Sequence, residues 1–381
     1  MRTNKPLKIG MTCYPSAGGS GIVATELGHA LADRGHEVHF ISYGIPFRLD
    51  MSRKNIFFHE VVVNAYPLFK YVDYSLPLSV KMAEVSEDFD LDILHVHYAV
   101  PHATAAFLAK QMLGRERCKP RVITTLHGTD VTLMSQDAHY KPIIKYSIDK
   151  SCGVTAVSES LKKQTQELFG ITKSIQVIYN FAVLKDVTIP RDTLRQQLKL
   201  KADDVLIVHA SNLRDVKRIP DLLTVLSKCP DPRVKLLIIA GASFSTYAGL
   251  VDSLGIKDRV LVREQVLDVE NYFNAADMGI YTSDKESFGL SILETMTYGH
   301  PVLGTQAGGI PEVIAHGETG WIYPVGDTDA MAEGLSQLVR DPVLRKRMGD
   351  SARHRALGVF SQKKIVDHYV RYYEEVLSQC P

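Results

Sequence analysis

A complete βαβ unit is encoded by residues 7–42, LKIGMTCYPSAGGSGIVATELGHALADRGHEVHFIS. Leu7–Thr12 is a short apolar run that predicts a buried strand, and Glu37–Ser42 predicts a second strand. Between them, Ile22–Arg34 has the apolar spacing of a helix, which we expect to end near Gly35. Because strand, helix and strand follow one another closely, we expect two parallel strands with a helix packed against them.

The same alternation continues in two series along the chain of 381 residues. In the first series, further strands are expected at Asp92–His97, Arg121–Leu126, Gly153–Val157 and Ile175–Ile178. In the second series, strands are expected at Val205–Ala210, Val234–Gly241, Arg259–Arg263, Met278–Thr282 and Pro301–Thr305. We therefore predict an α/β protein with a first domain in residues 1–185, a second in residues 186–358 and an amphipathic C-terminal helix in residues 359–381.

The charge balance excludes some classes of partner. Lysine and arginine together number 44 and aspartate and glutamate 43, so the net charge is +1, which gives no general attraction to nucleic acid or anionic membranes. No apolar run approaches the ~18 residues needed to cross a bilayer, and residues 1–6 lack the apolar stretch of a secretion signal. We expect a cytoplasmic protein without nucleic-acid or membrane partners, and the sequence leaves open whether it is a homo-oligomer.

Cysteines and histidines give little indication of a metal or a disulfide framework. The five cysteines are odd in number and scattered, without a Cys-x-x-Cys pair: Cys13, Cys118, Cys152, Cys229 and Cys380. His95 and His97 would share one face of a strand and His102 follows, which is a weak metal-ligand pattern. No matching cysteine or carboxylate lies nearby in the sequence, so we favour ordinary hydrogen-bond partners and predict no metal.

The glycine-rich residues 15–21, PSAGGSG, connect the first predicted strand to the first helix. Glycines there let a ligand approach the backbone, and a helix start offers N–H groups to an anion. A tight turn also requires glycine, so a phosphate contact and a purely structural role both remain open. The spacing is not Gly-x-Gly-x-x-Gly and residues 41–44, ISYG, lack a carboxylate, which disfavours a nicotinamide dinucleotide.

Two stretches of the second domain have the chemistry of a nucleotide-sugar site. Residues 211–218, SNLRDVKR, form a basic cluster after a strand, where it could hold a diphosphate or remain a solvated loop. Residues 286–290, ESFGL, and Glu294 place two acids around a helix start, an arrangement that suits a sugar, a phosphate and a ribose. The alternative is a surface helix with two solvated acids. A further helix-opening loop follows at residues 307–312, AGGIPE.

These motifs occur in the order found in the retaining family 4 glycosyltransferases of the GT-B fold, which the chain resembles over essentially its whole length. The resemblance is carried by Ser20 within Gly-Gly-Ser-Gly, His127-Gly128-Thr129-Asp130, the loop with Lys217, Glu286-Ser287-Phe288-Gly289 with Glu294, and Gly308-Gly309-Ile310-Pro311-Glu312. Five further stretches resemble a bacterial branch that transfers N-acetylglucosamine to L-malate at the start of bacillithiol biosynthesis: residues 9–15, 45–48, 94–102, 124–130 and 179–181.

The resemblance implies two Rossmann-like domains with an interdomain cleft, and a C-terminal helix that crosses back to the first domain. It implies UDP-N-acetylglucosamine and L-malate as substrates, and neither a cofactor nor a metal. For the catalytic set it implies Lys217 and Arg214 at the diphosphate and Glu286 and His127 at the sugar. The implied donor contacts are Gly19, Asn212, Phe288, Gly289, Leu290 and Glu294, with Glu294 at the ribose. The implied acceptor contacts are Ser20, Tyr98, Thr125, Arg48 and Asn180.

At two places the sequence departs from the family pattern, which limits how far the residue roles of the family can be assigned to this chain. Asn212 stands where many family 4 enzymes carry a phosphate-binding arginine, although the malate-using branch tolerates it. Residues 240–245, AGASFS, replace the usual Gly-Asp-Gly-Pro loop. Two other functions remain open: a transferase with a lipid or polysaccharide acceptor, and a non-catalytic nucleotide-sugar-binding protein.

Overall fold

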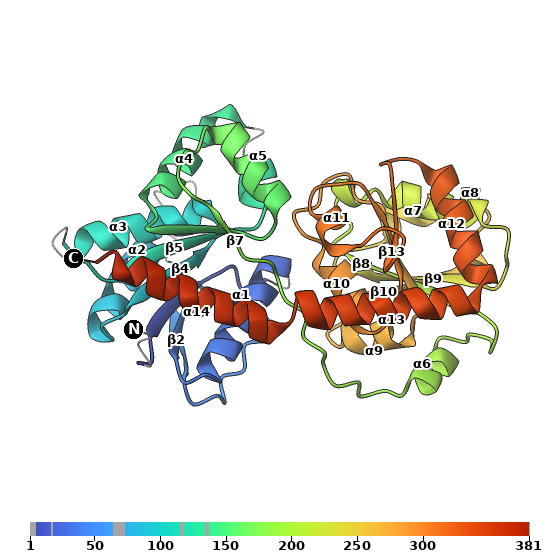
Figure 1. The fold of residues 1–381 in the computed structure, drawn as a ribbon, viewed down its shortest axis with the longest axis horizontal. Helices are drawn as coiled ribbons and strands as arrows, with labels where there is room; N and C mark the ends of the chain where they lie inside the picture. Colours follow the sequence, from blue (N-terminus) through green and yellow to red (C-terminus); the bar gives the residue numbers. More distant parts are fainter. Residues whose placement is uncertain (1–4, 17, 64–72, 115–117, 134–136, 381) are drawn as a thin grey trace. The chain divides into compact units, whose positions relative to one another are not determined.

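Both series of strands form parallel sheets, each within its own compact unit (Figure 1). The computed structural model describes residues 5–16, 18–63, 73–114, 118–133 and 137–380. The first unit comprises Met1–Asn180 together with Lys363–Pro381, and the second comprises Phe181–Gln362. Each unit is an α/β domain of the Rossmann-like kind that the sequence predicts.

The first unit contains a seven-stranded sheet in the order β3-β2-β1-β4-β5-β6-β7. Its strands are β1 (Lys8–Thr12), β2 (Glu37–Ser42), β3 (Ile56–Glu60), β4 (Ile93–His97), β5 (Arg121–Leu126), β6 (Gly153–Ala156) and β7 (Gln176–Val177). The order of strands reverses at β1, which pairs with β2 on one side and β4 on the other. Loops that follow β1 and β4 therefore lie next to each other at the carboxyl edge, where α/β sheets bind ligands.

The helices of the first unit include the long C-terminal helix. They are α1 (Gly19–Ala32), α2 (Ser75–Asp88), α3 (Thr104–Met112), α4 (Lys141–Lys150), α5 (Glu159–Phe169) and α14 (Gln362–Ser378). In α1 the helix begins at the glycine-rich loop and its first turn contains no acidic residue. Its N-terminal amides and the positive end of its dipole therefore remain suited to an anion.

The second unit contains a six-stranded sheet in the order β10-β9-β8-β11-β12-β13. Its strands are β8 (Val205–Ser211), β9 (Val234–Ala240), β10 (Val260–Glu264), β11 (Met278–Tyr281), β12 (Val302–Thr305) and β13 (Gly320–Tyr323). Its helices are α6 (Arg191–Gln197), α7 (Ile219–Lys228), α8 (Ala248–Ser253), α9 (Val269–Ala275), α10 (Leu290–Thr297), α11 (Ile310–Val313), α12 (Thr328–Arg340) and α13 (Pro342–Val359). Here the order reverses between β8 and β11.

Apolar side chains fill both faces of the second sheet. Val205 and Ile207 of β8 belong to the cluster that contains residues of α7 and α12, whereas Leu206 and Val208 belong to the opposite cluster with Phe273. Successive residues of a strand point to opposite faces, so this continuous apolar run is explained by helices on both sides of a parallel sheet.

Helix α14 packs against the sheet of the first unit, alongside which it lies in Figure 1. Tyr372 Oη accepts a hydrogen bond of 2.9 Å from the backbone N–H of Val154, and Tyr373 Oη lies 2.7 Å from His95 Nδ1. A Cβ atom on Gly153 would lie 2.8 Å from Tyr372 Oη, so the close approach of α14 requires glycine at this position. The C-terminal helix thus returns to the first unit, as the family resemblance implies.

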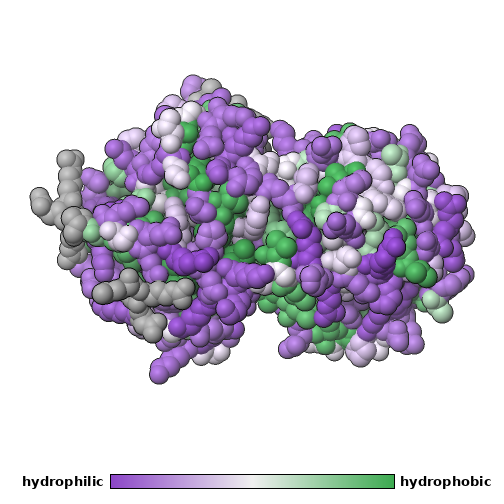
Figure 2. Space-filling view, viewed as in Figure 1, coloured by the Kyte–Doolittle hydropathy of each residue, from purple (hydrophilic) through white to green (hydrophobic). Residues whose placement is uncertain are grey.

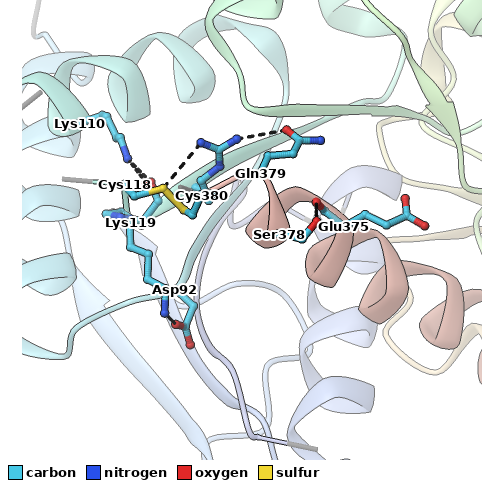
Figure 3. Close-up of a disulfide and its surroundings, with 10 residues drawn as sticks. Asp92, Lys110, Cys118, Lys119, Glu375, Ser378, Gln379 and Cys380 are labelled. Atoms are coloured by element: carbon cyan, nitrogen blue, oxygen red, sulfur yellow. Dashed lines mark hydrogen bonds and ion pairs between the residues drawn. A yellow bond between two sulfur atoms is a disulfide. The ribbon is translucent and has the colours of Figure 1, made fainter. Parts of the chain in front are cut away.

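The structure contains one disulfide, although the cysteine pattern indicates no disulfide framework. Cys118, before β5, is bonded to Cys380, after α14, with Cα atoms 5.8 Å apart (Figure 3). Lys110 Nζ donates a hydrogen bond of 2.5 Å to the carbonyl of Cys118, and Arg121 Nη2 donates one of 3.2 Å to Gln379 Oε1. The two cysteines are 262 residues apart and meet only because α14 returns to β5, which cysteine spacing does not reveal.

The face shown in Figure 2 is mainly hydrophilic, with smaller hydrophobic patches on both units. Among the residues that the structure describes, no helix has the length and apolar character required to span a membrane.

Candidate functional site

The second-unit site lies at the reversal point between β8 and β11. The loop after β8 carries Lys217, and the loop after β11 carries Glu286. Their side chains form an ion pair with 2.5 Å between Lys217 Nζ and Glu286 Oε2, and they are only 17% and 18% exposed. The topology thus brings together a cation and an acid that the sequence singled out in separate motifs.

Backbone contacts fix the two loops of the second-unit site to each other. The backbone N–H of Asp284 donates a hydrogen bond of 3.0 Å to the carbonyl of Val216, and Thr282 Oγ1 donates one of 2.9 Å to the carbonyl of Lys217. Because both bonds are accepted by main-chain carbonyls of the basic loop, they hold the two loops together without using the charged groups of Lys217 and Glu286.

The Gly-Gly-Ile-Pro turn at residues 308–311 packs against the backbone of the loop that carries Glu286. The backbone N–H of Gly309 donates a hydrogen bond of 2.8 Å to the carbonyl of Glu286. A Cβ atom on Gly308, which has a φ of 53°, would lie 1.8 Å from the same carbonyl oxygen. The second glycine-rich motif therefore has a packing role that positions an acid of the site.

Helix α10 begins directly after this loop. Phe288 is buried against Phe360, with ring centroids 5.6 Å apart, and Gly289 precedes the helix with a φ of 99°. The first turn contains no acidic residue, so its N–H groups present a positive end toward the loop of Glu286. Glu294 follows within α10 and is half-buried. The amides and acids predicted to hold a nucleotide sugar therefore lie on one loop and the helix that follows it.

The remaining donor residues of this unit lie on the loop after β8. Asn212 and Arg214 are exposed, and the carbonyl of Arg214 accepts a hydrogen bond of 2.7 Å from the N–H of Lys217. The segment that replaces the usual family loop follows β9. Beyond it, Tyr247 Oη donates a hydrogen bond of 3.2 Å to the carbonyl of Leu213, which braces the basic loop.

The first-unit site lies at the reversal point between β1 and β4. Gly19 begins α1, and Ser20 Oγ lies 2.8 Å from Tyr98 Oη after β4. Tyr98 has a φ of 92°, a conformation that a tyrosine rarely adopts and that is often found at functional sites. Its backbone N–H donates a hydrogen bond of 2.9 Å to the carbonyl of Thr125, which holds this conformation. Two predicted acceptor residues are thus in contact.

The other predicted acceptor residues are placed differently. Thr125 is fully buried, and its Oγ1 lies 2.7 Å from His95 Nε2 and 2.6 Å from Thr155 Oγ1. Its hydroxyl therefore belongs to an internal network, while its carbonyl supports Tyr98. Arg48 is half-buried, with its guanidinium 5.4 Å from the Phe47 ring centre. Asn180 is 6% exposed, and its Oδ1 has no hydrogen-bond partner among the described residues.

His127 follows β5 in a loop organised by Asp130. Asp130 Oδ1 accepts hydrogen bonds from the N–H groups of Gly128 (2.9 Å) and His127 (3.3 Å), and Oδ2 accepts one from Ala99 (3.0 Å). Burial raises the pKa of Asp130, and these amides oppose the shift. Burial also lowers the pKa of His127 to about 3, so its ring is neutral at ordinary pH.

Comparison with known proteins identifies the family. The model "Glycosyltransferase Family 4" matches residues 17–185, and the model "Glycosyl transferases group 1" matches residues 190–355. The chain is 47% identical over 375 residues to N-acetyl-alpha-D-glucosaminyl L-malate synthase of Bacillus anthracis, with 97% of each chain covered. The chain belongs to the family 4 glycosyltransferases.

This glycosyltransferase is also similar to more distant proteins. It is 29% identical to D-inositol 3-phosphate glycosyltransferase of Mycolicibacterium smegmatis, over 75% of this chain and 68% of the relative. Among solved structures, a glycosyltransferase from Rickettsia africae has a TM-score of 0.81 at 21% identity, covering 98% of this chain and 99% of that one. Anabaena HepE in complex with UDP and glucose has a TM-score of 0.83 at 19% identity, covering 97% and 100%. These structures support the GT-B fold.

Two residues of this glycosyltransferase have structural roles that sequence reasoning did not assign. Asp130 belongs to the motif of His127, and a carboxylate two residues after glycine in a strand-to-helix loop is a signal for backbone capping. The sequence pattern indicates only a weak metal ligand at His97, whereas in the structure its Nδ1 lies 2.7 Å from His127 Nε2. Within the described part of the chain, no three residues among His, Cys, Asp and Glu are grouped as metal ligands.

Proposed function

We propose that this glycosyltransferase transfers N-acetylglucosamine from UDP-N-acetylglucosamine to the hydroxyl group of L-malate, the first step of bacillithiol biosynthesis, with retention at the anomeric carbon. The observation that carries the proposal is the 47% identity, over 97% of both chains, to an enzyme named for the malate product. The site geometry supports the chemistry in each unit.

In the second unit, Lys217 and Arg214 neutralise the diphosphate and the N-terminus of α10 contributes its amides. Glu286 and the amides of Phe288, Gly289 and Leu290 hold the sugar, and Glu294 holds the ribose, with Asn212 as a further donor contact. The Lys217–Glu286 ion pair supports these roles because it places the two side chains next to each other in the second-unit site. Donor binding then exchanges this pair for contacts to phosphate and sugar hydroxyls.

The reaction needs no protein nucleophile. The bond between the anomeric carbon and the diphosphate oxygen breaks, the malate oxygen bonds to the same face of that carbon, and the hydroxyl proton passes to the departing phosphate. Lys217 and Arg214 stabilise the charge that develops on the diphosphate. These cations and the helix N-termini supply the positive charge, so the proposal includes neither a metal nor a cofactor.

In the first unit, Ser20, Tyr98 and the amides around Gly19 bind malate at the N-terminus of α1. The absence of acidic residues from the first turn of α1 supports an anionic acceptor. Thr125, Arg48 and Asn180 complete the predicted acceptor set, and His127 is the sugar contact from this unit. The cytoplasmic location is part of this proposal.

The test uses the purified chain, UDP-N-acetylglucosamine and a panel of acceptors with product detection by mass. We expect turnover with L-malate, much weaker turnover with lactate, which lacks the second carboxylate, and no loss of activity on chelation. Equal turnover with lactate or a sugar alcohol would refute the malate assignment. UDP release that no acceptor stimulates would refute the transferase assignment, and transfer only to lipid or polysaccharide would support the alternative acceptor class.

A further inference from the structure

Two histidines from neighbouring strands meet ring to ring in the first unit. His97 ends β4, and His127 follows β5, which pairs with β4. His97 Nδ1 lies 2.7 Å from His127 Nε2, and the rings are stacked with centroids 5.0 Å apart and planes at 23°. His97 is completely buried and His127 is half-buried. The hydrogen bond uses Nε2 of His127, so a ligand of this ring must be bound through Nδ1.

The surroundings of His97 hold its ring in place. Its carbonyl accepts a hydrogen bond of 2.5 Å from His102 Nδ1, and its ring is stacked on His95, with centroids 4.6 Å apart. His95 in turn lies 2.7 Å from Tyr373 Oη of α14 and 2.7 Å from Thr125 Oγ1. These contacts restrict the orientation of the His97 ring. A hydrogen bond from a ring held in this way restricts the orientation of the His127 ring as well.

The same hydrogen bond constrains the protons of both rings. Burial lowers the pKa of His97 well below its ordinary value and that of His127 to about 3, so both rings are neutral. A neutral imidazole carries one N–H donor and one bare acceptor nitrogen. One ring must therefore donate in this bond and the other must accept.

The second nitrogen of His97 indicates which ring donates. His97 Nε2 is buried and has no hydrogen-bond partner among the described residues. If this nitrogen carried the proton, a buried N–H would lack an acceptor, and orphaned buried N–H groups are rarer than orphaned acceptors. The proton of His97 is therefore assigned to Nδ1, which donates to His127 Nε2. His127 must then carry its own proton on Nδ1.

We propose that His97 is a positioning residue of the transfer reaction, which orients the His127 ring and fixes its tautomer so that Nδ1–H donates to an oxygen of the transferred sugar. This rests on the proposed function, because it takes His127 as a contact of that sugar. The hydrogen bond to His97 leaves Nδ1 as the only ring nitrogen that can serve the substrate, and it makes that nitrogen a donor.

The first experiment compares two substitutions of His97. His97→Leu removes the hydrogen bond, whereas His97→Asn keeps a polar group near the position of Nδ1. We expect His97→Leu to lower kcat by about 10- to 100-fold, by analogy with the outer-shell hydrogen-bond partners of metal-binding histidines. The KM for malate should stay unchanged, and His97→Asn should recover most of kcat. Equal losses in both variants, or a loss confined to the malate KM, would overturn the proposal.

The first unit offers a matched control in a second buried histidine pair. His39 Nδ1 lies 2.9 Å from His59 Nε2, on β2 and β3, and His39 is completely buried. His39→Leu should lower thermal stability about as much as His97→Leu. It should leave kcat largely unchanged, because His39 and His59 lie on β2 and β3, outside the loops of the proposed site. If His39→Leu lowers kcat as strongly as His97→Leu, the role of His97 is only structural and the proposal fails.

The second experiment reads the tautomer directly in the wild-type chain, and so does not depend on the folding of a variant. Long-range ¹⁵N–¹H correlation spectra of ¹⁵N-histidine-labelled protein should place the protons of His97 and His127 on Nδ1. A proton on Nε2 of His127 would overturn the proposal. If this pattern is found but the enzyme does not glycosylate malate, the proposed function fails while the histidine arrangement stands.

Discussion

Replacement of Lys217 by methionine should separate the catalytic role of its charge from its role in stability. Methionine keeps much of the side-chain length but removes the cation that we propose binds the diphosphate. Loss of one preorganised group that stabilises developing charge costs about 2.7–4 kcal/mol of transition-state stabilisation, or about 10²–10³ in kcat. We therefore expect Lys217→Met to lose activity in this range.

The structure also predicts a stability cost for this substitution. Glu286 is 18% exposed and pairs with Lys217 at 2.5 Å, so the substitution leaves a largely buried carboxylate without its cation. A fully buried pair would lose several kcal/mol, and partial exposure reduces this to about 1–3 kcal/mol. The double variant with Glu286→Gln should regain stability, because no unpaired charge remains, but it should not regain activity.

Activity is measured as UDP release at saturating substrates, and stability as thermal and urea unfolding of the same preparations. A matched control is Arg195→Met, since Arg195 forms a 3.0 Å ion pair with Asp277 in the same unit, with side chains 12% and 17% exposed. Arg195→Met should lower stability with kcat largely unchanged. A kcat for Lys217→Met within tenfold of wild type would refute the reasoning, as would equal losses of kcat in both variants.

Three further results are expected. Ser20→Ala or Tyr98→Phe should raise the malate KM by up to about tenfold, because a neutral hydrogen bond contributes about 0.5–1.5 kcal/mol; an equal rise in the KM of UDP-N-acetylglucosamine would argue against an acceptor role. Reduction of the Cys118–Cys380 disulfide should lower the free energy of unfolding by about 2–4 kcal/mol. In the Cys380→Ser variant, the melting temperature should not depend on reductant. Identical melting of the wild type with and without reductant would contradict this prediction. Burial lowers the pKa of His95 from 6.5 to about 3. Between these pH values the unfolded chain binds a proton at this histidine that the folded chain does not bind. The free energy of unfolding should therefore decrease as pH falls from about 6.5 to 3, by up to about 1.4 kcal/mol per pH unit for this histidine. His95→Gln should flatten this dependence, and an unchanged slope would show that other groups cause it.

The sequence predicts most of the fold because parallel strands buried on both faces leave continuous apolar runs. β8 is such a run, and its predicted and observed bounds differ by one residue. Two strands were not predicted: β3 and β13 lie at the sheet edges, where a short strand pairs on one side only. The predicted strand at Ile175–Ile178 is reduced to the two residues of β7, which is also an edge strand.

The candidate site is partly predictable for a topological reason. The motifs of Lys217 and Glu286 each follow a strand, and their contact arises because β8 and β11 are neighbours where the sheet order reverses. In contrast, the direction of a strand-end side chain depends on tertiary packing. Thr125 is an example, because packing within the unit directs its hydroxyl toward His95 and Thr155. The Cys118–Cys380 bond likewise depends on the return of α14.

The most direct test of the central claim is a proton NMR spectrum of the product formed from UDP-N-acetylglucosamine and L-malate by the purified chain. We predict one new α-linked N-acetylglucosaminyl malate, formed in equal amount with UDP and only when malate is present. A β-linked product, or UDP release at the same rate without malate, would contradict the account.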